Sequence, residues 1–346
     1  MNRPARLAAF ALALLGAAAP AAAAKEPPLF VPVYQQDFAD PSIVEHRGEY
    51  IGYATNRGLN LPMITSRDLV NWEVVKDPGN PGKPLDGMPE LGAWAREDFT
   101  WAPEVTKIGG RWVLYYTARH RKKDIQCIGV ATSADPRGPF RDALAEPLVC
   151  QPELGGTIDA NLFRDTDDKL YLYFKNDGNH VAKPTELWGQ RLSADGTGLV
   201  GAPVRLGMTN DKPWEAHVIE APTMVRTATG YTMLYSANHY GWETHQRLSP
   251  YAMGYAICAG PMGPCTDAPD NPILHSFNDR KAGCLSGPGH QVIFRGHDRY
   301  YIGFHAWAAT PGCRPLDKKR YLYIAPIGFT AAGKPVISPS LRPAGK

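Results

Sequence analysis

Five short motifs in the sequence carry residues that could do chemistry, and they follow one another along the chain. Asp40 opens DPSIV, Trp101 opens WAPEV, Asp159 opens DANLF, Glu220 opens EAPTMV and His290 opens HQVIF. Three of these residues are acids. Two carboxyl groups on opposite sides of a sugar suffice for glycoside hydrolysis, because a protonated one donates to the leaving oxygen while an ionised one activates water or attacks carbon. A third acid nearby raises the pKa of the donor.

A structural role is the alternative for each acid taken alone. Asp beside Pro or Ser, as in Asp40-Pro41-Ser42, often caps a turn through its side chain. Three acids gathered in one cavity argue against that role, because crowded like charges cost free energy and push one pKa upward. We therefore favour catalysis, and the longer reach of Glu220 suits it to proton donation.

The five motifs belong to a repeat of about sixty residues. Each motif is followed, after a polar turn, by an aromatic and aliphatic run with strand character. These runs are HRGEYIGYAT ending at Thr55, IGGRWVLYYT ending at Thr117, TDDKLYLYFK ending at Lys175, TATGYTMLYS ending at Ser236 and GHDRYYIGFH ending at His305. Each repeat therefore starts with a strand carrying one distinctive residue, turns, and returns along an aromatic strand.

Five such repeats predict an all-β fold, a five-bladed β-propeller with no helix of consequence. The period fits four strands and their loops per blade. In a propeller the first strand of every blade lines the central axis. Asp40, Trp101, Asp159, Glu220 and His290 should therefore face one another in one cavity. We expect a single propeller domain over residues 25–346.

Several other residues are candidates with two interpretations each. Trp101 is either a core residue or a wall of the pocket that meets the C–H face of a sugar. His239 and Trp242, in NHYGW, predict a substrate-binding loop at the rim. His290, in the glycine-rich GPGHQ, either ligates a metal ion or its waters at the cavity floor or bonds to an acid. We expect a tight backbone approach to the axis at these glycines.

The remaining polar and aromatic residues of the motifs receive no chemistry. Glu104, in WAPEV, is expected on the turn that follows the first strand. His217, His305 and Trp307 are expected in the core or behind the site.

The composition is that of a globular β-rich protein. Glycine, proline and tyrosine, at 34, 32 and 16 residues, are used in turns and strands rather than in helix interiors. The 346 residues include 37 Lys and Arg against 34 Asp and Glu, a net charge of +3. Nucleic-acid binding proteins usually carry a clear basic excess, so we expect no nucleic-acid partner.

Residues 1–24 have the pattern of a cleaved secretory signal peptide. Arg3 and Arg6 precede an apolar run over 7–15 and a tract of small residues that ends at Ala24. A membrane anchor is the alternative, but the apolar run is far shorter than the ~20 residues that a spanning helix needs. We therefore expect a secreted or periplasmic protein with no membrane partner.

Export makes the six cysteines candidates for disulfides. Cys258 and Cys265 bracket the turn-rich AGPMGP and are the first choice, and proximity favours Cys127 with Cys150 and Cys284 with Cys313. Zinc binding is the alternative, but the chain has no CxxC or HxxxH spacing.

At these motifs the chain resembles glycoside hydrolase family 43, five-bladed propellers that include α-L-arabinofuranosidases, arabinanases and β-xylosidases. The resemblance runs from DFADPS at Asp37 through WAPEV, TIDANLF and VIEAPTMV to GPGHQ and FHAW. It implies that Asp40 is the general base, that Asp159 orients the acid and modulates its pKa, and that Glu220 is the general acid. It places His290 near a structural calcium or sodium ion at the propeller centre, and the chemistry needs no cofactor.

The resemblance leans towards the arabinofuranosidases in IDANLFRD and LYLYFKND, although many members have Gly where this chain has Ala221. We predict an inverting, exo-acting glycosidase that removes α-L-arabinofuranosyl units from plant cell-wall arabinan or arabinoxylan, with the two catalytic carboxyls roughly 6.5–9.5 Å apart. A β-xylosidase or endo-arabinanase of the same fold is one alternative. A non-catalytic carbohydrate-binding propeller is another, although it would be expected to have lost one of the acids.

Overall fold

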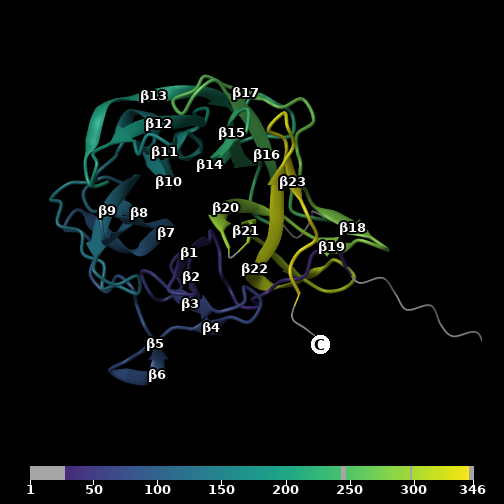
Figure 1. Ribbon diagram of the computed structural model, residues 1–346, viewed down its shortest axis with the longest axis horizontal. Coiled ribbons are helices and arrows are strands. Elements are labelled where there is room, and N and C mark those ends of the chain that lie inside the picture. Colours follow the sequence, from purple (N-terminus) through teal and green to yellow (C-terminus); the bar gives the residue numbers. More distant parts are fainter. Residues whose placement is uncertain (1–27, 243–246, 297, 343–346) are drawn as a thin grey trace, which may run out of the picture.

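The computed structural model describes residues 28–242, 247–296 and 298–342, and the regular structure of that part is almost entirely β-strand. Five sheets stand around a central axis, and the colours of Figure 1 follow the chain once around it, from β1 past β14 to β22. The only helices among the described residues are two short 3-10 helices, η1 (Pro152–Leu154) and η2 (Gly178–Val181). The predicted all-β, five-bladed propeller is confirmed.

Each blade is an antiparallel sheet whose strands follow one another along the chain. Blade 1 consists of β1 (Ser42–His46), β2 (Glu49–Tyr53), β3 (Met63–Ser66) and β4 (Glu73–Val74), and blade 2 of β7 (Ala95–Ile108), β8 (Arg111–His120) and β9 (Gln126–Ser133). Blade 3 consists of β10 (Thr157–Arg164), β11 (Leu170–Asn176), β12 (Glu186–Leu192) and β13 (Leu199–Thr209), and blade 4 of β14 (Ile219–Thr227), β15 (Gly230–Ala237), β16 (Ala252–Cys258) and β17 (Cys265–Asp267). Blade 5 consists of β20 (Gly289–Arg295), β21 (Tyr300–Ala309), β22 (Pro315–Phe329) and β23 (Pro335–Ile337). Two hairpins lie between blades, β5 (Lys76–Asp77) with β6 (Asn80–Pro84) and β18 (Phe277–Asp279) with β19 (Gly283–Leu285).

The second strand of each blade packs between its neighbours, which explains the recurring aromatic runs. Every residue of β11, LYLYFKN, is buried. Tyr115 of β8 shares an apolar cluster with Phe174 of β11, and Tyr173 of β11 shares the next cluster with Tyr235 of β15. Apolar burial on both faces therefore joins adjacent blades and holds the inner strands around the axis.

A β-bulge near the start of each inner strand decides which side chains reach the axis. In blade 3, Ile158 pairs with Lys175 and Asn161 with Tyr173, so β10 has one residue more than β11 between these pairs. The other four blades have the same extra residue. The first bulged residue has a positive φ each time, in Asp40 (53°), Ala102 (44°), Asp159 (60°), Ala221 (51°) and His290 (50°).

This register corrects the predicted alignment of the repeats. Asp40, Asp159 and His290 are equivalent, but Trp101 and Glu220 each lie one residue before the bulge, where Ala102 and Ala221 take the equivalent place. The alignment by side-chain type was wrong at these two blades because the distinctive residue there precedes the bulge. A positive φ strains a residue that has a Cβ, and such strain concentrates at functional sites.

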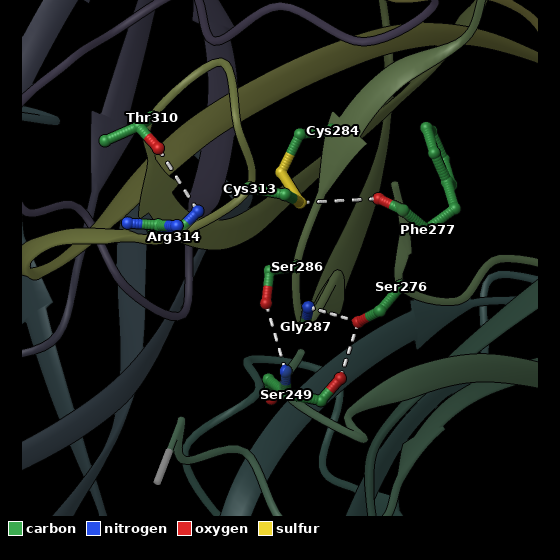
Figure 2. The surroundings of a disulfide bond; sticks show 9 residues. All are labelled: Ser249, Ser276, Phe277, Cys284, Ser286, Gly287, Thr310, Cys313 and Arg314. Atoms are coloured by element: carbon green, nitrogen blue, oxygen red, sulfur yellow. Dashed lines mark hydrogen bonds between the residues drawn. A yellow bond between two sulfur atoms is a disulfide. The ribbon is translucent and has the colours of Figure 1, made fainter. Parts of the chain in front are cut away.

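All six cysteines are paired, and the three predicted pairs are confirmed: Cys127 with Cys150, Cys258 with Cys265, and Cys284 with Cys313. This pairing excludes the zinc alternative for these cysteines. Figure 2 shows how the Cys284–Cys313 disulfide ties β19 to the turn after β21. Beside it, Ser249 donates its N–H to Ser286 and accepts a hydrogen bond from Ser276 at its carbonyl. The hairpin thereby anchors the segment that precedes β16.

The predicted signal peptide, residues 1–24, lies outside the described residues. Among the residues that are described, no helix is long and apolar enough to cross a membrane.

Candidate active site

A cavity of about 540 Å³ lies at the axis, where residues of all five blades converge. It brings together the predicted Asp40, Trp101, Asp159, Glu220, His239 and His290. Trp242, predicted with His239, is not among the described residues that line it. The full lining is Asp40, Thr55, Trp101, Arg119, Ile158, Asp159, Lys175, Asp177, Asn179, His180, His217, Val218, Glu220, His239, Tyr240, His290 and Arg320.

Asp40 is held as an anion in this cavity. Its Oδ1 lies 3.2 Å from the Arg320 guanidinium and 3.3 Å from Nδ1 of His290. The Thr55 hydroxyl donates to Oδ2. Burial alone would raise the pKa of Asp40, but the charge of Arg320, followed by the contact with His290, holds that pKa well below its ordinary value. Asp40 therefore has the protonation state that a general base needs.

His305 is a neutral support behind Asp40. Burial, with the charge of Arg320 next, lowers the pKa of His305 to about 4. The Asp40 backbone N–H donates to its Nδ1 at 3.1 Å, so its hydrogen is on Nε2, an atom that is buried without a hydrogen-bond partner among the described residues. His305 thus lies where it was expected, behind the site. The same expectation was wrong for His217, which is exposed and lines the cavity.

Asp159 and Glu220 form a second carboxyl centre. An oxygen of each lies within 4.8 Å of the other and of a ring nitrogen of His290. Burial, reinforced by the negative charge of Glu220 and opposed by His290 and Lys175, raises the pKa of Asp159 to about 7. Two carboxyls that are close together share a proton that a lone carboxylate would have lost. Asp159 therefore keeps a proton up to a pH at which a free carboxyl has lost it.

Two donors that the sequence did not identify hold Glu220. Tyr251 donates to Oε1 at 2.6 Å, and the ammonium of Lys175 lies 3.5 Å from Oε2. Burial raises the pKa of Tyr251 well above its ordinary value, so it acts as a neutral donor. A Cβ at position 289 would come within 2.1 Å of the Tyr251 ring. The close approach at Gly289 is therefore towards Tyr251 and that at Gly287 is towards Ser249, whereas we had predicted a close approach to the axis.

The cluster of Asp159, Glu220 and His290 is compact enough to surround a metal ion, but its hydrogen bonds do not suit one. The Ala221 N–H donates to Asp159 Oδ2 at 3.1 Å, and Tyr251 and Lys175 point to Glu220. The Lys175 ammonium, 3.5 Å from Glu220 Oε2, would repel a cation bound to that carboxyl group.

A second, small cavity of about 20 Å³ lies on the axis, where His290 meets Glu104, Asn161 and Gln291. It has room for about one water-sized occupant, and oxygen ligands suit calcium or sodium. His290 as a ligand to such an ion stays a prediction.

Glu104 lies inside strand β7, and its expected place on a turn was wrong because the strand continues to Ile108. The Ser42 hydroxyl and the Leu162 N–H donate to its carboxyl group at 3.3 and 3.2 Å. Burial raises the pKa of Glu104 to about 7. Its contacts connect the inner strands of blades 1, 2 and 3 on the axis.

Tyr240 is a rim residue that the sequence reasoning passed over in favour of its neighbours His239 and Trp242. The side chain is 49% exposed, with the Arg320 guanidinium 5.2 Å from its ring centroid. Its carbonyl accepts hydrogen bonds from Trp307 Nε1 at 2.7 Å and from Ser249 Oγ at 3.2 Å. Ser249 is the residue that the disulfide-bonded hairpin anchors in Figure 2. An exposed aromatic ring fixed at the cavity suits the C–H face of a sugar.

Comparison with known proteins decides the family. The sequence profile described as Glycosyl hydrolases family 43 matches residues 31–335. The chain belongs to this family. The family 43 chain is therefore a glycoside hydrolase, and its chemistry needs no cofactor.

The curated relatives of this family 43 chain agree on hydrolysis of a glycosidic bond and differ in the sugar. β-D-Galactofuranosidase xynD of Aspergillus niger is 28% identical over 79% of this chain and 75% of its own length. Two proteins of Bacillus subtilis, extracellular endo-α-(1→5)-L-arabinanase 2 and β-xylosidase, are 25% and 27% identical over 68% and 78% of this chain. The chain spans about half the length of these two, 51% and 48%.

Solved structures show the same fold. A thermostable family-43 glycoside hydrolase superposes with a TM-score of 0.73 at 28% identity, over 89% of this chain and 96% of that one. An endo-arabinase from Bacteroides thetaiotaomicron gives 0.66 at 22% identity, over 87% and 98%.

Proposed function

We propose that this chain is an inverting, exo-acting glycosidase that releases α-L-arabinofuranosyl units. The observation that carries the proposal is the contrast between two carboxyl centres in one cavity. Arg320 and His290 hold Asp40 ionised, while Asp159 beside Glu220 has its pKa raised to about 7 by burial and by the charge of Glu220. A base and an acid with pKa values pushed apart are the requirement for glycoside hydrolysis at one pH.

In the proposed reaction Asp40 takes a proton from a water molecule, and that water attacks the anomeric carbon. The bond between this carbon and the glycosidic oxygen breaks on the other face, and Glu220 gives its proton to the departing oxygen. Asp159 keeps the proton in the acid pair and is itself held by the Ala221 N–H. His290 lies between the two centres, with Nδ1 3.3 Å from Asp40 Oδ1. No step requires a metal ion.

Substrate binding is assigned to the walls and rim of the cavity. Trp101 and His239 line it, and the ring of Tyr240 offers an apolar face to a sugar ring. Trp242, on the same loop, remains a proposed contact for a longer substrate.

The choice of arabinofuranose rests on the motifs IDANLFRD and LYLYFKND and on the arabinanase among the relatives. β-D-Galactofuranose is a second candidate because the A. niger relative bears that activity in its name and aligns over most of both chains. The two sugars share the configuration of the furanose ring and differ by one hydroxymethyl group, a change that a pocket discriminates by roughly 10–200-fold. β-Xylosidase and endo-arabinanase activities are the other outcomes.

We also propose that the protein is exported and acts on plant cell-wall polysaccharide as a single propeller domain. Three disulfides among the described residues and an extracellular relative support export.

The test is a substrate panel of nitrophenyl α-L-arabinofuranoside, nitrophenyl β-D-galactofuranoside, nitrophenyl β-D-xylopyranoside and linear arabinan, with Asp40→Asn as the inactive control. We expect the highest kcat/KM on the arabinofuranoside and release of monosaccharide from arabinan. A higher kcat/KM on the galactofuranoside or the xyloside would overturn the assignment of arabinofuranose as the sugar. Oligosaccharides as the first products from arabinan would overturn exo action in favour of endo action.

A further inference from the structure

The five blades have an equivalent residue in the second strand or just after it, opposite the residue before the bulge. Trp101 pairs with Thr117, Ile158 with Lys175, Glu220 with Ser236 and Gly289 with His305, and in blade 1 the Thr55 N–H donates to the Ala39 carbonyl. The five equivalent residues are Thr55, Thr117, Lys175, Ser236 and His305. Their side chains face the next blade around the axis.

Four of these side chains do the same structural work. Each accepts a hydrogen bond from the backbone N–H of the bulged residue in the following blade. Ala102 donates to Thr55 at 3.0 Å, Asp159 to Thr117 at 3.4 Å, His290 to Ser236 at 2.8 Å and Asp40 to His305 at 3.1 Å. At these four junctions between blades, the hydrogen bond gives the N–H of a strained backbone its acceptor.

The junction between blades 3 and 4 departs from the pattern because its residue is Lys175. An ammonium group has three donors and no acceptor, so it cannot receive the N–H of Ala221. That N–H donates to Asp159 Oδ2 at 3.1 Å instead. The Lys175 side chain is fully buried, with Nζ 2.7 Å from Asn179 Oδ1, 3.5 Å from Glu220 Oε2 and 3.7 Å from Asp177 Oδ1.

A buried ammonium is costly because it leaves water, whereas Thr or Ser at this position would accept the Ala221 N–H without that cost. The hydrogen bonds between blades therefore do not explain why a charged residue occupies position 175. Its carboxylate neighbours are Asp177 and Glu220. Glu220 is the group that changes charge in the proposed reaction, from a neutral carboxyl to a carboxylate as its proton leaves.

We propose that Lys175 is a positioning residue for the general acid, which orients Glu220 and stabilises the carboxylate that forms on it as the leaving oxygen is protonated. The inference rests on the proposed function of Glu220. Asp159 and Lys175 then act in opposite senses on one proton. When the proton shared by the pair is on Glu220, the negative charge of Asp159 retains it there before reaction, and the positive charge of Lys175 favours its departure in the transition state.

The test uses Lys175→Thr, which supplies the acceptor that the other junctions have and removes the ammonium. Rates are measured on two glycosides of the same sugar, one with a methyl leaving group and one with a dinitrophenyl leaving group. The methyl glycoside needs protonation of its oxygen and the dinitrophenyl one does not. We expect kcat on the methyl glycoside to fall roughly 10- to 100-fold more than on the dinitrophenyl glycoside. Lys175→Arg should restore part of that difference.

Ser236→Ala is the matched control, because it removes the acceptor of an equivalent junction, at the His290 N–H, and leaves Asp159, Tyr251 and Lys175 beside Glu220 in place. It should lower both rates by the same factor. Equal losses on both glycosides for Lys175→Thr, or unchanged rates, would overturn the proposal and leave Lys175 a structural residue.

A double variant keeps the proposal testable if Lys175→Thr unfolds at a lower temperature. In a Glu220→Gln background, Lys175→Arg should add less than roughly a twofold further loss, because a residue that acts through Glu220 has nothing left to act on. A full additional loss would contradict the proposal. If Glu220→Gln itself shows no dependence on the leaving group, the proposed function fails first and the role of Lys175 fails with it.

Discussion

Asp40 and Asp159 occupy the same bulge in different blades, yet the pKa values of their carboxyl groups move in opposite directions. Both side chains are buried, and both backbone N–H groups donate to the preceding blade, Asp40 to His305 and Asp159 to Thr117. Burial raises the pKa of each, but Arg320 and His290 bring that of Asp40 well below its ordinary value, whereas Glu220 helps to raise that of Asp159 to about 7. The repeat therefore supplies position, and the neighbours supply the protonation state.

The largest effect should follow loss of the acid. Glu220→Ala is expected to lower kcat by roughly 10²–10⁴-fold on glycosides with poor leaving groups, and far less on activated aryl glycosides, because only the former need a proton. Steady-state kinetics on matched substrates measures this. If both kinds of substrate lose the same factor, the acid centre is elsewhere.

The next largest effect should follow loss of the cation that holds Asp40 ionised. Arg320→Met removes the cation 3.2 Å from Asp40, so burial is less opposed and the pKa of Asp40 rises. Since the base must be ionised, the acidic limb of the kcat/KM profile should move to higher pH by roughly one to three units. Arg320→Lys should give a smaller movement. An acidic limb that stays in place in Arg320→Met would mean that Asp40 is not the base.

The corresponding change in the carboxyl pair of Asp159 and Glu220 is Asp159→Asn. Asp159 is protonated below about pH 7 and ionises as the pH rises through that value. Asparagine removes the like charge that retains a proton in the pair, so the alkaline limb should move to lower pH by roughly one unit. A pH–rate profile of the variant measures it, and an unchanged alkaline limb removes Asp159 from its role.

The smallest effect should come from a junction between blades whose linking side chain is uncharged. Ser236→Ala leaves the His290 N–H without its acceptor at 2.8 Å, so the free energy of unfolding should fall by roughly 1–3 kcal/mol. Denaturant unfolding measures this, and both pH limbs should keep their positions. A shifted limb would show that the uncharged junctions also change the pKa values of the carboxyl groups, contrary to the division of roles inferred from Asp40 and Asp159.

The fold and the meeting of Asp40, Asp159 and Glu220 in one cavity were predictable because the repeat consists of residue types that recur about every sixty positions. The register was not, since a bulge adds one residue without a signature in side-chain type, and Trp101 and Glu220 were placed one position too late in the repeat. Arg320 and Tyr251 were missed because they lie outside the inner strands, and nothing local in the sequence says that they reach Asp40 and Glu220.

Lys175 was within reach of the sequence. The five hairpin runs end in Thr, Thr, Lys, Ser and His, and Lys alone among these cannot accept a hydrogen bond. Without the bulge geometry, however, nothing shows that an acceptor is required there. Tyr240 could not be separated from His239 and Trp242 by pattern, because its role depends on contacts with Ser249 and with Trp307, which lies 67 residues further along the chain.

The most direct test of the central claim, that Asp40 and Glu220 act on one sugar from opposite faces, is proton NMR of the sugar released in the first turnovers of an α-L-arabinofuranoside. Direct attack by a water that Asp40 deprotonates inverts the anomeric centre, so the β-anomer should form first and then equilibrate. First release of the α-anomer would contradict it.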